Sequence, residues 1–163
     1  MKDKNIKENR GFALLYAILI SSMLLAIGLG VANVSFKEAK FSTSAKDTND
    51  AFFAADTGAE CALFYDRVNP TSNAFDITPI NPITCAGNTI TVTPSGSPAT
   101  FWIFTVPLLG NASKGCAKVT VDKTTAVTEV ISKGYNVGSG GTPPNATCTQ
   151  SANSVEREID LTY

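Results

Sequence analysis

The chain has 163 residues, 44% of them hydrophobic, and its 13 Lys+Arg and 14 Asp+Glu leave a formal net charge of −1. A near-neutral chain has no basic field to attract nucleic acid, so nucleic-acid binding is not predicted. The sequence contains no histidine, the usual general base, and shows no phosphate-binding loop or nucleophile motif. We therefore predict neither an enzyme nor a bound cofactor.

The chain begins with a basic segment, residues 1–11, followed by a long apolar run. No charged residue occurs from Gly11 to Phe36. As a helix rising about 1.5 Å per residue this run reaches roughly 39 Å, which exceeds the ~30 Å hydrocarbon core of a bilayer. A basic flank before an apolar run places the N-terminus in the cytoplasm. The sequence predicts a single-pass membrane helix with its N-terminus inside.

A cleaved secretion signal is the alternative reading of the same run. Secretion signals have a shorter apolar region of about 7–15 residues and end in a small-x-small site. Gly30-Val31-Ala32 matches such a site, and cleavage there would release a soluble chain.

The residues after the run favour a helix that continues out of the membrane. From Val34 to Val68 the sequence has one glycine, Gly58, and no proline, and Asn69-Pro70 provides a helix stop. The spacing predicts an amphipathic helix over 37–68, because several small or apolar residues share one helical face: Phe52, Ala55, Ala59, Ala62 and Leu63.

Residues 69–163 are predicted to form a small β-rich head. Alternation and turn residues predict five strands, at Thr89–Thr93, Ala99–Val106, Ala117–Asp122, Ala126–Ser132 and Val155–Tyr163. In the last strand Arg157 shares the apolar face, so we expect it to reach the rim or to pair with an acid such as Glu129. The fold class is therefore α+β, with the amphipathic half of a long helix packed on an antiparallel sheet.

A loop is predicted between the last two strands, in "YNVGSGGTPPNATCTQSANS". Loops held on a rigid sheet often carry binding specificity, so we expect the partner-facing surface of the head here.

Four cysteines, Cys61, Cys85, Cys116 and Cys148, follow the apolar run. On the outer side of a membrane an even number of cysteines favours disulfides. A metal site is not predicted, because the spacings contain no close ligand pair. Three pairings are open, and free thiols remain an alternative; our hypothesis is Cys61 with Cys85 and Cys116 with Cys148.

The N-terminal third carries a resemblance to a known family. "RGFALLYAILISSMLLAIGLGVANVSFKEAKFSTSAKDTNDAFFAADTGAECAL" resembles the N-terminal segment of type IV pilin-like proteins, most nearly the PilX-like minor pilins. Within it, "AFFAADTGAECAL" is similar to the alanine-rich motif with an acidic residue that closes the helix in those proteins. The resemblance covers roughly the first 65 residues.

The resemblance implies a processing and assembly pathway. A prepilin peptidase would cut between Gly11 and Phe12 and methylate the new N-terminal residue. Residues 1–11 would then be a leader, residues 12–36 the membrane and assembly helix, residues 37–68 its amphipathic extension and residues 69–163 the head. The implied partners are other pilin subunits, the peptidase and the cytoplasmic membrane, and the implied destination is an extracellular pilus or pseudopilus.

Tyr16 departs from the commonest pilin pattern. Major pilins usually carry glutamate as the fifth mature residue, a buried acid that pairs with the N-terminus of a neighbouring subunit; here that residue is Tyr16. PilX-like minor pilins and tip pseudopilins also lack this acid, so Tyr16 favours a minor or tip subunit. Its alternative role is that of an interfacial aromatic residue.

A second function class stays open beside the filament subunit. The chain could be a monomeric, membrane-anchored module whose head binds an extracellular ligand and never polymerises. Cleavage after Gly11 distinguishes the two, because a permanent anchor needs no cut. The sequence does not distinguish pilus, competence and secretion systems.

Overall fold

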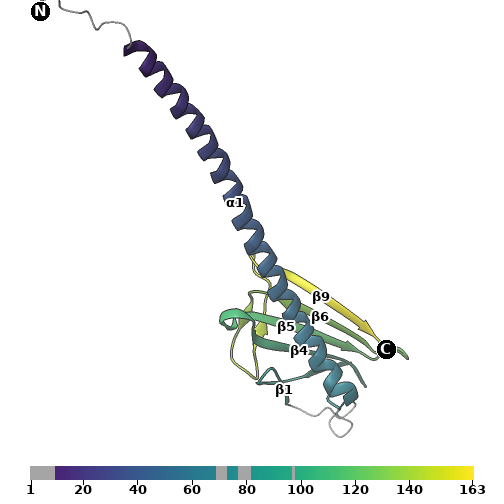
Figure 1. Ribbon diagram of the computed structural model, residues 1–163. Coiled ribbons are helices and arrows are strands. Elements are labelled where there is room, and N and C mark those ends of the chain that lie inside the picture. Colours follow the sequence, from purple (N-terminus) through teal and green to yellow (C-terminus); the bar gives the residue numbers. More distant parts are fainter. Residues whose placement is uncertain (1–9, 69–72, 77–81, 97) are drawn as a thin grey trace, which may run out of the picture. The chain divides into compact units, whose positions relative to one another are not determined.

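The computed structural model describes residues 10–68, 73–76, 82–96 and 98–163, and places a long helix before a set of antiparallel strands (Figure 1). Helix α1 spans Arg10–Leu63 and continues into a π-helical turn, η1, at Phe64–Val68. The chain divides into two compact units, Met1–Thr43 and Ser44–Tyr163. The predicted α+β arrangement is confirmed.

In the first unit the described residues belong to α1 alone. Hydroxyl side chains in this part bond to the helix backbone: the Ser21 hydroxyl donates to the Ala17 carbonyl at 2.7 Å and the Ser22 hydroxyl to the Leu19 carbonyl at 2.8 Å. These two hydroxyls are therefore satisfied within the helix, which suits an apolar environment.

The second unit contains a five-stranded antiparallel sheet. Its order is β3-β4-β5-β6-β9, with β3 Thr93–Gly96, β4 Ala99–Leu109, β5 Gly115–Asp122, β6 Glu129–Tyr135 and β9 Glu156–Thr162. Two short hairpins accompany it: β1 Ile83–Cys85 pairs with β2 Asn88–Ile90, and β7 Ser139–Gly140 pairs with β8 Thr147–Cys148. A 3₁₀ turn, η2 Asn111–Ser113, precedes β5.

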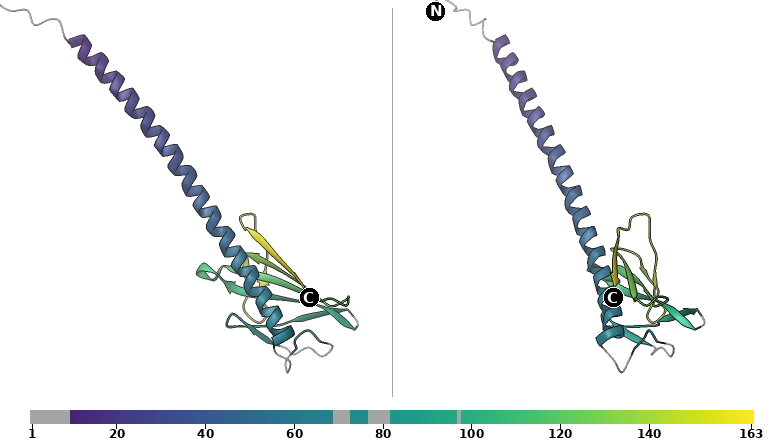
Figure 2. Two further views of the ribbon diagram at one scale, coloured as in Figure 1. Left: turned by 45° about the vertical axis from the view of Figure 1, so that its right-hand side comes forward. Right: turned by 90° about the vertical axis from the view of Figure 1, so that its right-hand side faces the viewer.

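The core of this unit lies between the sheet and the C-terminal part of α1, which runs along one face of the sheet (Figure 2). The helix contributes small residues, and the strands contribute large ones. The buried residues include Ala51, Ala54, Ala55, Ala59 and Ala62 from α1, and Trp102, Phe104, Val106, Val119, Val121 and Val130 from the sheet. Alternate residues of each strand face the helix, as the pleat requires.

The structure corrects the predicted helix face. Ala55, Ala59 and Ala62 are buried as expected, but Phe52 is 47% exposed and Leu63 is only half-buried. The residues that replace them at the sheet are Ala51 and Ala54. Because helix and sheet approach closely, alanine fits where a phenylalanine ring would not.

The structure also corrects three strand predictions. The predicted strand Thr89–Thr93 is divided between β2 and β3, which belong to different sheets. The strand predicted at Ala126–Ser132 begins and ends three residues later, as β6. Hairpin β7–β8 lies inside the segment predicted as a loop, and Pro94 lies within β3, an edge strand where proline is tolerated.

Candidate functional site

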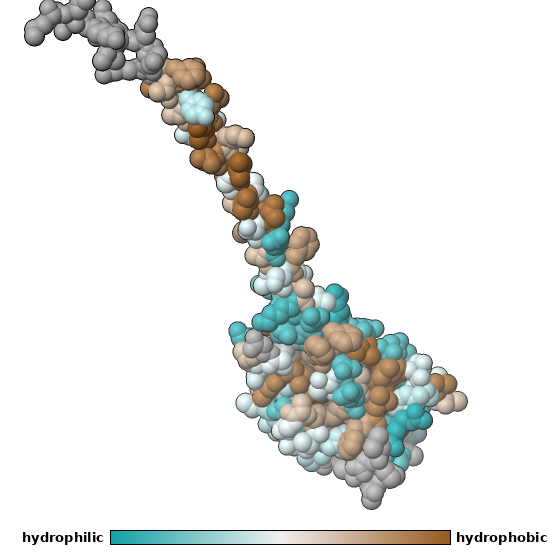
Figure 3. Space-filling model, in the orientation of Figure 1, coloured by the Kyte–Doolittle hydropathy of each residue, from teal (hydrophilic) through white to brown (hydrophobic). Residues whose placement is uncertain are grey.

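The apolar part of α1 is the first candidate for a functional surface. Among the described residues one helix, Phe12–Arg67, is long and apolar enough to cross a membrane, by length and composition. In the first part of this helix the large apolar side chains are exposed, and Figure 3 shows hydrophobic surface along it. They include Leu14, Leu15, Ile18, Leu19, Met23, Leu24, Leu25, Ile27, Leu29 and Val31.

The predicted processing positions lie at the start of this helix. Gly11 is in the first turn of α1, Phe12 is 76% exposed, and Tyr16 is 58% exposed one turn later. Most of the predicted leader, residues 1–9, falls outside the described residues. The roles of Gly11, Phe12 and Tyr16 stay predictions.

Two glycines in the apolar part, Gly28 and Gly30, have open space around them among the described residues. A Cβ added at Gly28 or Gly30 would meet no atom within 4 Å. Glycine weakens a helix by roughly 0.5–1 kcal/mol relative to alanine, and no contact among the described residues requires it here. Small residues in membrane helices allow close approach of another helix.

The second part of α1 meets the sheet through a close small-residue contact. A Cβ at Gly134 of β6 would overlap the backbone of Ala51 and Ala55, and a Cβ at Gly58 would lie 2.7 Å from Val119 Cγ2. The buried Ser132 hydroxyl donates to the Ala55 carbonyl at 2.6 Å. The helix and sheet are therefore fixed together by fit and by a buried hydrogen bond.

A polar cluster at the end of the helix was not predicted from the sequence. The Asp66 side chain, only 6% exposed, forms an ion pair with Lys123 and accepts a 2.7 Å hydrogen bond from the Tyr163 hydroxyl. The Arg67 guanidinium lies 4.6 Å from the Tyr163 ring centroid. These residues are far apart in sequence, so no local pattern could reveal the cluster.

The cluster raises the pKa of Tyr163 well above its usual value of about 10. Burial is the main cause, since it disfavours the phenolate. The Asp66 carboxylate adds to it by accepting the phenol hydrogen bond and by repelling a phenolate. Tyr163 therefore stays a neutral hydrogen-bond donor at physiological pH.

The structure contains the two disulfides of our hypothesis. Cys61 of α1 is bonded to Cys85 of β1, with Cα atoms 5.9 Å apart, and Cys116 of β5 to Cys148 of β8, with Cα atoms 5.7 Å apart. The Tyr65 hydroxyl reinforces the first bridge by bonding to both backbone groups of Thr84. The first bridge ties the helix end to the β1–β2 hairpin, and the second ties the long loop to the five-stranded sheet.

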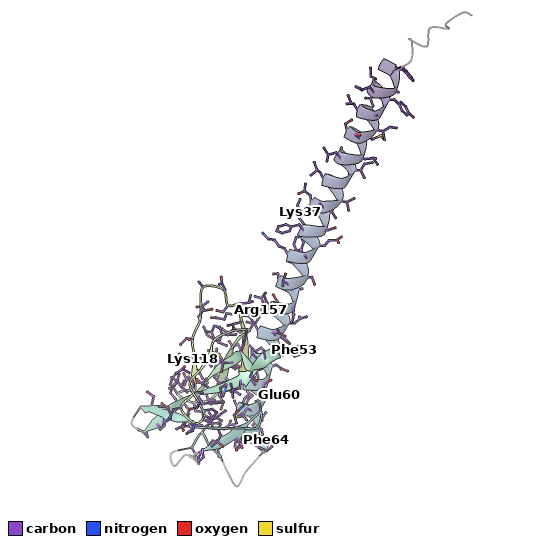
Figure 4. All side chains as sticks on the ribbon, turned by 90° about the vertical axis from the view of Figure 1, so that its left-hand side faces the viewer. Lys37, Phe53, Glu60, Phe64, Lys118 and Arg157 are labelled. Carbon is purple, nitrogen blue, oxygen red and sulfur yellow. A yellow bond between two sulfur atoms is a disulfide. The ribbon has the colours of Figure 1, made fainter. Side chains whose placement is uncertain are left out.

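Arg157 lies at the rim of the sheet rather than in the core. It is exposed, and its Nη2 is 3.5 Å from the Thr48 hydroxyl of α1 (Figure 4). Of the two expected arrangements, reaching the rim is confirmed; the ion pair with Glu129 is absent among the described residues.

A shallow cleft of about 190 Å³ lies beside the long loop. Its walls come from Thr91, Thr93, Ile103, Phe104 and Thr105, and from Pro144, Asn145 and Ala146 of the loop. None of these lining residues is ionisable, so the cleft offers hydroxyl and amide groups but no acid or base. Part of the predicted partner-facing loop therefore borders a neutral polar cleft.

No set of three or more acidic or cysteine side chains in the described part of the chain could hold a metal ion. Comparison of the chain with protein-family models, with curated proteins and with solved structures gave no match. The functional interpretation therefore rests on the residues and on the fold.

Proposed function

We propose that this chain is a filament subunit of the type IV pilin kind, a minor pilin or pseudopilin, processed after Gly11 and assembled through its N-terminal helix. The observation that carries the proposal is the contrast along α1. Its first part exposes its apolar side chains, while an alanine face of its last part, between Ala51 and Ala62, is buried against the sheet of a disulfide-linked head. One continuous helix thus serves two environments.

The apolar part explains both membrane storage and assembly. Before assembly it lies in the cytoplasmic membrane, because burying its exposed leucine and isoleucine side chains in lipid is favourable by roughly 25 cal/mol per Å². In the filament the same surface packs against helices of other subunits. Gly28 and Gly30, where an added Cβ would meet no described atom within 4 Å, allow those helices to approach closely.

The head would then be the part displayed outside the cell. Disulfides suit an oxidising compartment, and both bridges lie in the second unit. Tyr16 stands where major pilins carry the glutamate that pairs with a neighbouring N-terminus, so this subunit would be scarce or placed at a tip. Its partners are other pilin subunits and the prepilin peptidase.

The test is intact-mass and N-terminal peptide mass spectrometry of the protein isolated from the membrane of a host that has its prepilin peptidase. A chain that starts at Phe12, with or without one methyl group, supports the filament subunit. A chain that starts at Met1 favours the permanently anchored binding module. A chain that starts at Asn33 identifies the apolar run as a secretion signal.

A substitution sharpens this test. Gly11→Val should block leader removal, because a branched side chain would not fit a peptidase pocket that selects glycine. Gly28→Val is the matched control, since it makes the same change within the helix and should leave the cut at Phe12 unchanged. Normal processing of the Gly11 variant would refute the assigned site.

A further inference from the structure

Strand β9 forms one edge of the five-stranded sheet (Figure 1). It pairs with β6 on one side, through seven residue pairs without a register shift. On its other side no strand is found among the described residues. An uninterrupted edge of this length is a template for a further strand.

The backbone direction of β9 follows from its hydrogen bonds. The Tyr163 N–H donates to the Thr128 carbonyl, and the Tyr163 carbonyl accepts a hydrogen bond from the Thr128 N–H. At the other end of the strand the Val155 carbonyl accepts a hydrogen bond from the Asn136 N–H. In an antiparallel strand the backbone N–H and C=O groups of successive residues point alternately to one neighbouring strand and to the other side. The backbone groups of Arg157, Ile159 and Leu161 therefore also point toward β6. The intervening residues direct their N–H and C=O groups outward.

These outward residues are Glu156, Glu158, Asp160 and Thr162. The Glu156 carbonyl accepts a 3.4 Å hydrogen bond from Arg157 Nη1. Within the described part of the chain, the backbone groups of Glu158, Asp160 and Thr162 have no partner, and all three residues are exposed. The edge therefore offers the backbone groups of three alternate residues for pairing with another strand.

The two faces of this edge differ in chemistry. On the face away from α1 lie the carboxylates of Glu156, Glu158 and Asp160. Lys133 is 3.8 Å from Glu156 and 2.9 Å from Glu158, whereas Asp160 lies opposite Ile131 and has no ion pair among the described residues. On the face toward α1, Ile159 and Leu161 are only half-buried.

The opposite edge of the sheet, strand β3, is less able to pair with a further strand. Strand β3 has four residues, contains Pro94, which has no N–H, and has a register shift between Ser95 and Gly96. Short length, proline and a bulge are the features that close an edge to further pairing. The chain closes one edge in this way and leaves the other open.

We infer that the outer edge of β9 is a docking site for an extended strand of another protein in which Lys or Arg alternates with Val or Ile. The backbone groups of Glu158, Asp160 and Thr162 supply the pairing, the acids attract the basic residues, and Ile159 and Leu161 receive the apolar ones. A second β9 does not fit, because antiparallel pairing would place acids opposite acids. The inference does not depend on filament assembly.

The test uses the full chain in uncharged detergent micelles and a peptide of four lysines alternating with three valines. Binding is followed by fluorescence anisotropy and by hydrogen exchange of the β9 amides. We expect exchange at Glu158, Asp160 and Thr162 to slow by at least about tenfold when the site is saturated. The control peptide has the same composition in two blocks, which cannot place lysine and valine on opposite faces.

Two variants locate the site. Asp160→Pro removes one outward N–H, and Asp160→Lys reverses one charge; each should weaken binding by at least about fivefold. Glu60→Lys makes an equal charge change at an exposed position of α1 and should leave affinity within about twofold. If Asp160→Pro does not fold, Asp160→Lys alone still tests whether the peptide binds at this edge.

Three results would overturn the inference. One is equal binding of the alternating and block peptides, which would indicate charge attraction alone. Another is unchanged exchange at the outward amides of β9. The third is an equal loss of affinity in the Glu60 and Asp160 lysine variants.

Discussion

Residues 12–43 and 44–63 belong to one continuous helix but obtain their stability differently. In the first part the apolar side chains are exposed, and added bulk at Gly28 or Gly30 would meet nothing. In the second part an alanine stripe is buried on the sheet, and the contact with Gly134 leaves no room for a Cβ. Small residues thus mark an internal contact in one part and an open surface in the other.

The largest effect that this comparison predicts comes from filling the internal contact. Gly134→Val should destabilise the head by more than about 3 kcal/mol, because the side chain overlaps the backbone of α1, which cannot move aside as a side chain would. The free energy of unfolding is measured by urea denaturation in detergent, followed by the fluorescence of Trp102, the one tryptophan of the chain.

Gly28→Val makes the same change in the open part of the helix. We expect it to alter the unfolding of the head by less than about 0.5 kcal/mol, because its side chain meets nothing within 4 Å. Equal destabilisation by the two variants would remove the distinction between the two parts.

The second effect concerns the bridge at the helix end. Replacing both Cys61 and Cys85 by serine should lower the free energy of unfolding by about 2–4 kcal/mol, since the bridge closes a loop with a sequence separation of 24. The double variant avoids leaving a free thiol. An unchanged urea midpoint would show that the bridge adds nothing to the packing and hydrogen bonds that hold the helix end.

The sequence predicted local features well, and the reasons are physical. Helix length follows from an uninterrupted apolar run and the absence of proline, and the alternation in Ala117–Asp122 and in the last strand follows from the strand period of two. Both β5 and β9 form as expected. The pairing of Cys61 with Cys85 is the one proposed from their positions.

Features that depend on tertiary distance were not predictable in the same way. Periodicity placed Phe52 on the buried face of α1. However, α1 approaches β6 so closely at Gly134 that only small helix residues fit against the sheet. The pairing of Asp66 with Lys123 and Tyr163 joins a helix end, a turn and the last residue. No local pattern gives such a contact.

A smaller effect tests the buried hydrogen bond between α1 and the sheet. Ser132→Ala should cost about 1.5 kcal/mol, because the buried hydroxyl donates to the Ala55 carbonyl. Ser21→Ala is the control in the open part, where the hydroxyl bonds only within the helix. If both variants unfold at the wild-type urea concentration, close packing alone fixes the helix on the sheet.

The smallest effect is a change in alkaline stability. Tyr163→Phe loses the hydrogen bond to Asp66, which should cost about 1 kcal/mol at neutral pH. Because the pKa of Tyr163 is higher in the folded chain, its contribution is complete below about pH 10, the unfolded value, and is lost as the pH rises through the folded value. The difference between wild type and variant should therefore shrink above about pH 10.

The variant should keep part of the alkaline loss, because burial beside Glu156 raises the pKa of Tyr135 to about 12 and the carboxylates of Glu158 and Glu156 raise the pKa of Lys133. Both groups act in the same direction as Tyr163, stabilising the fold below their unfolded pKa values and less above them. Urea midpoints at about pH 8 and about pH 10.5 separate these contributions. A difference between wild type and variant that stays constant up to about pH 10.5 would contradict a raised pKa of Tyr163 in the folded chain.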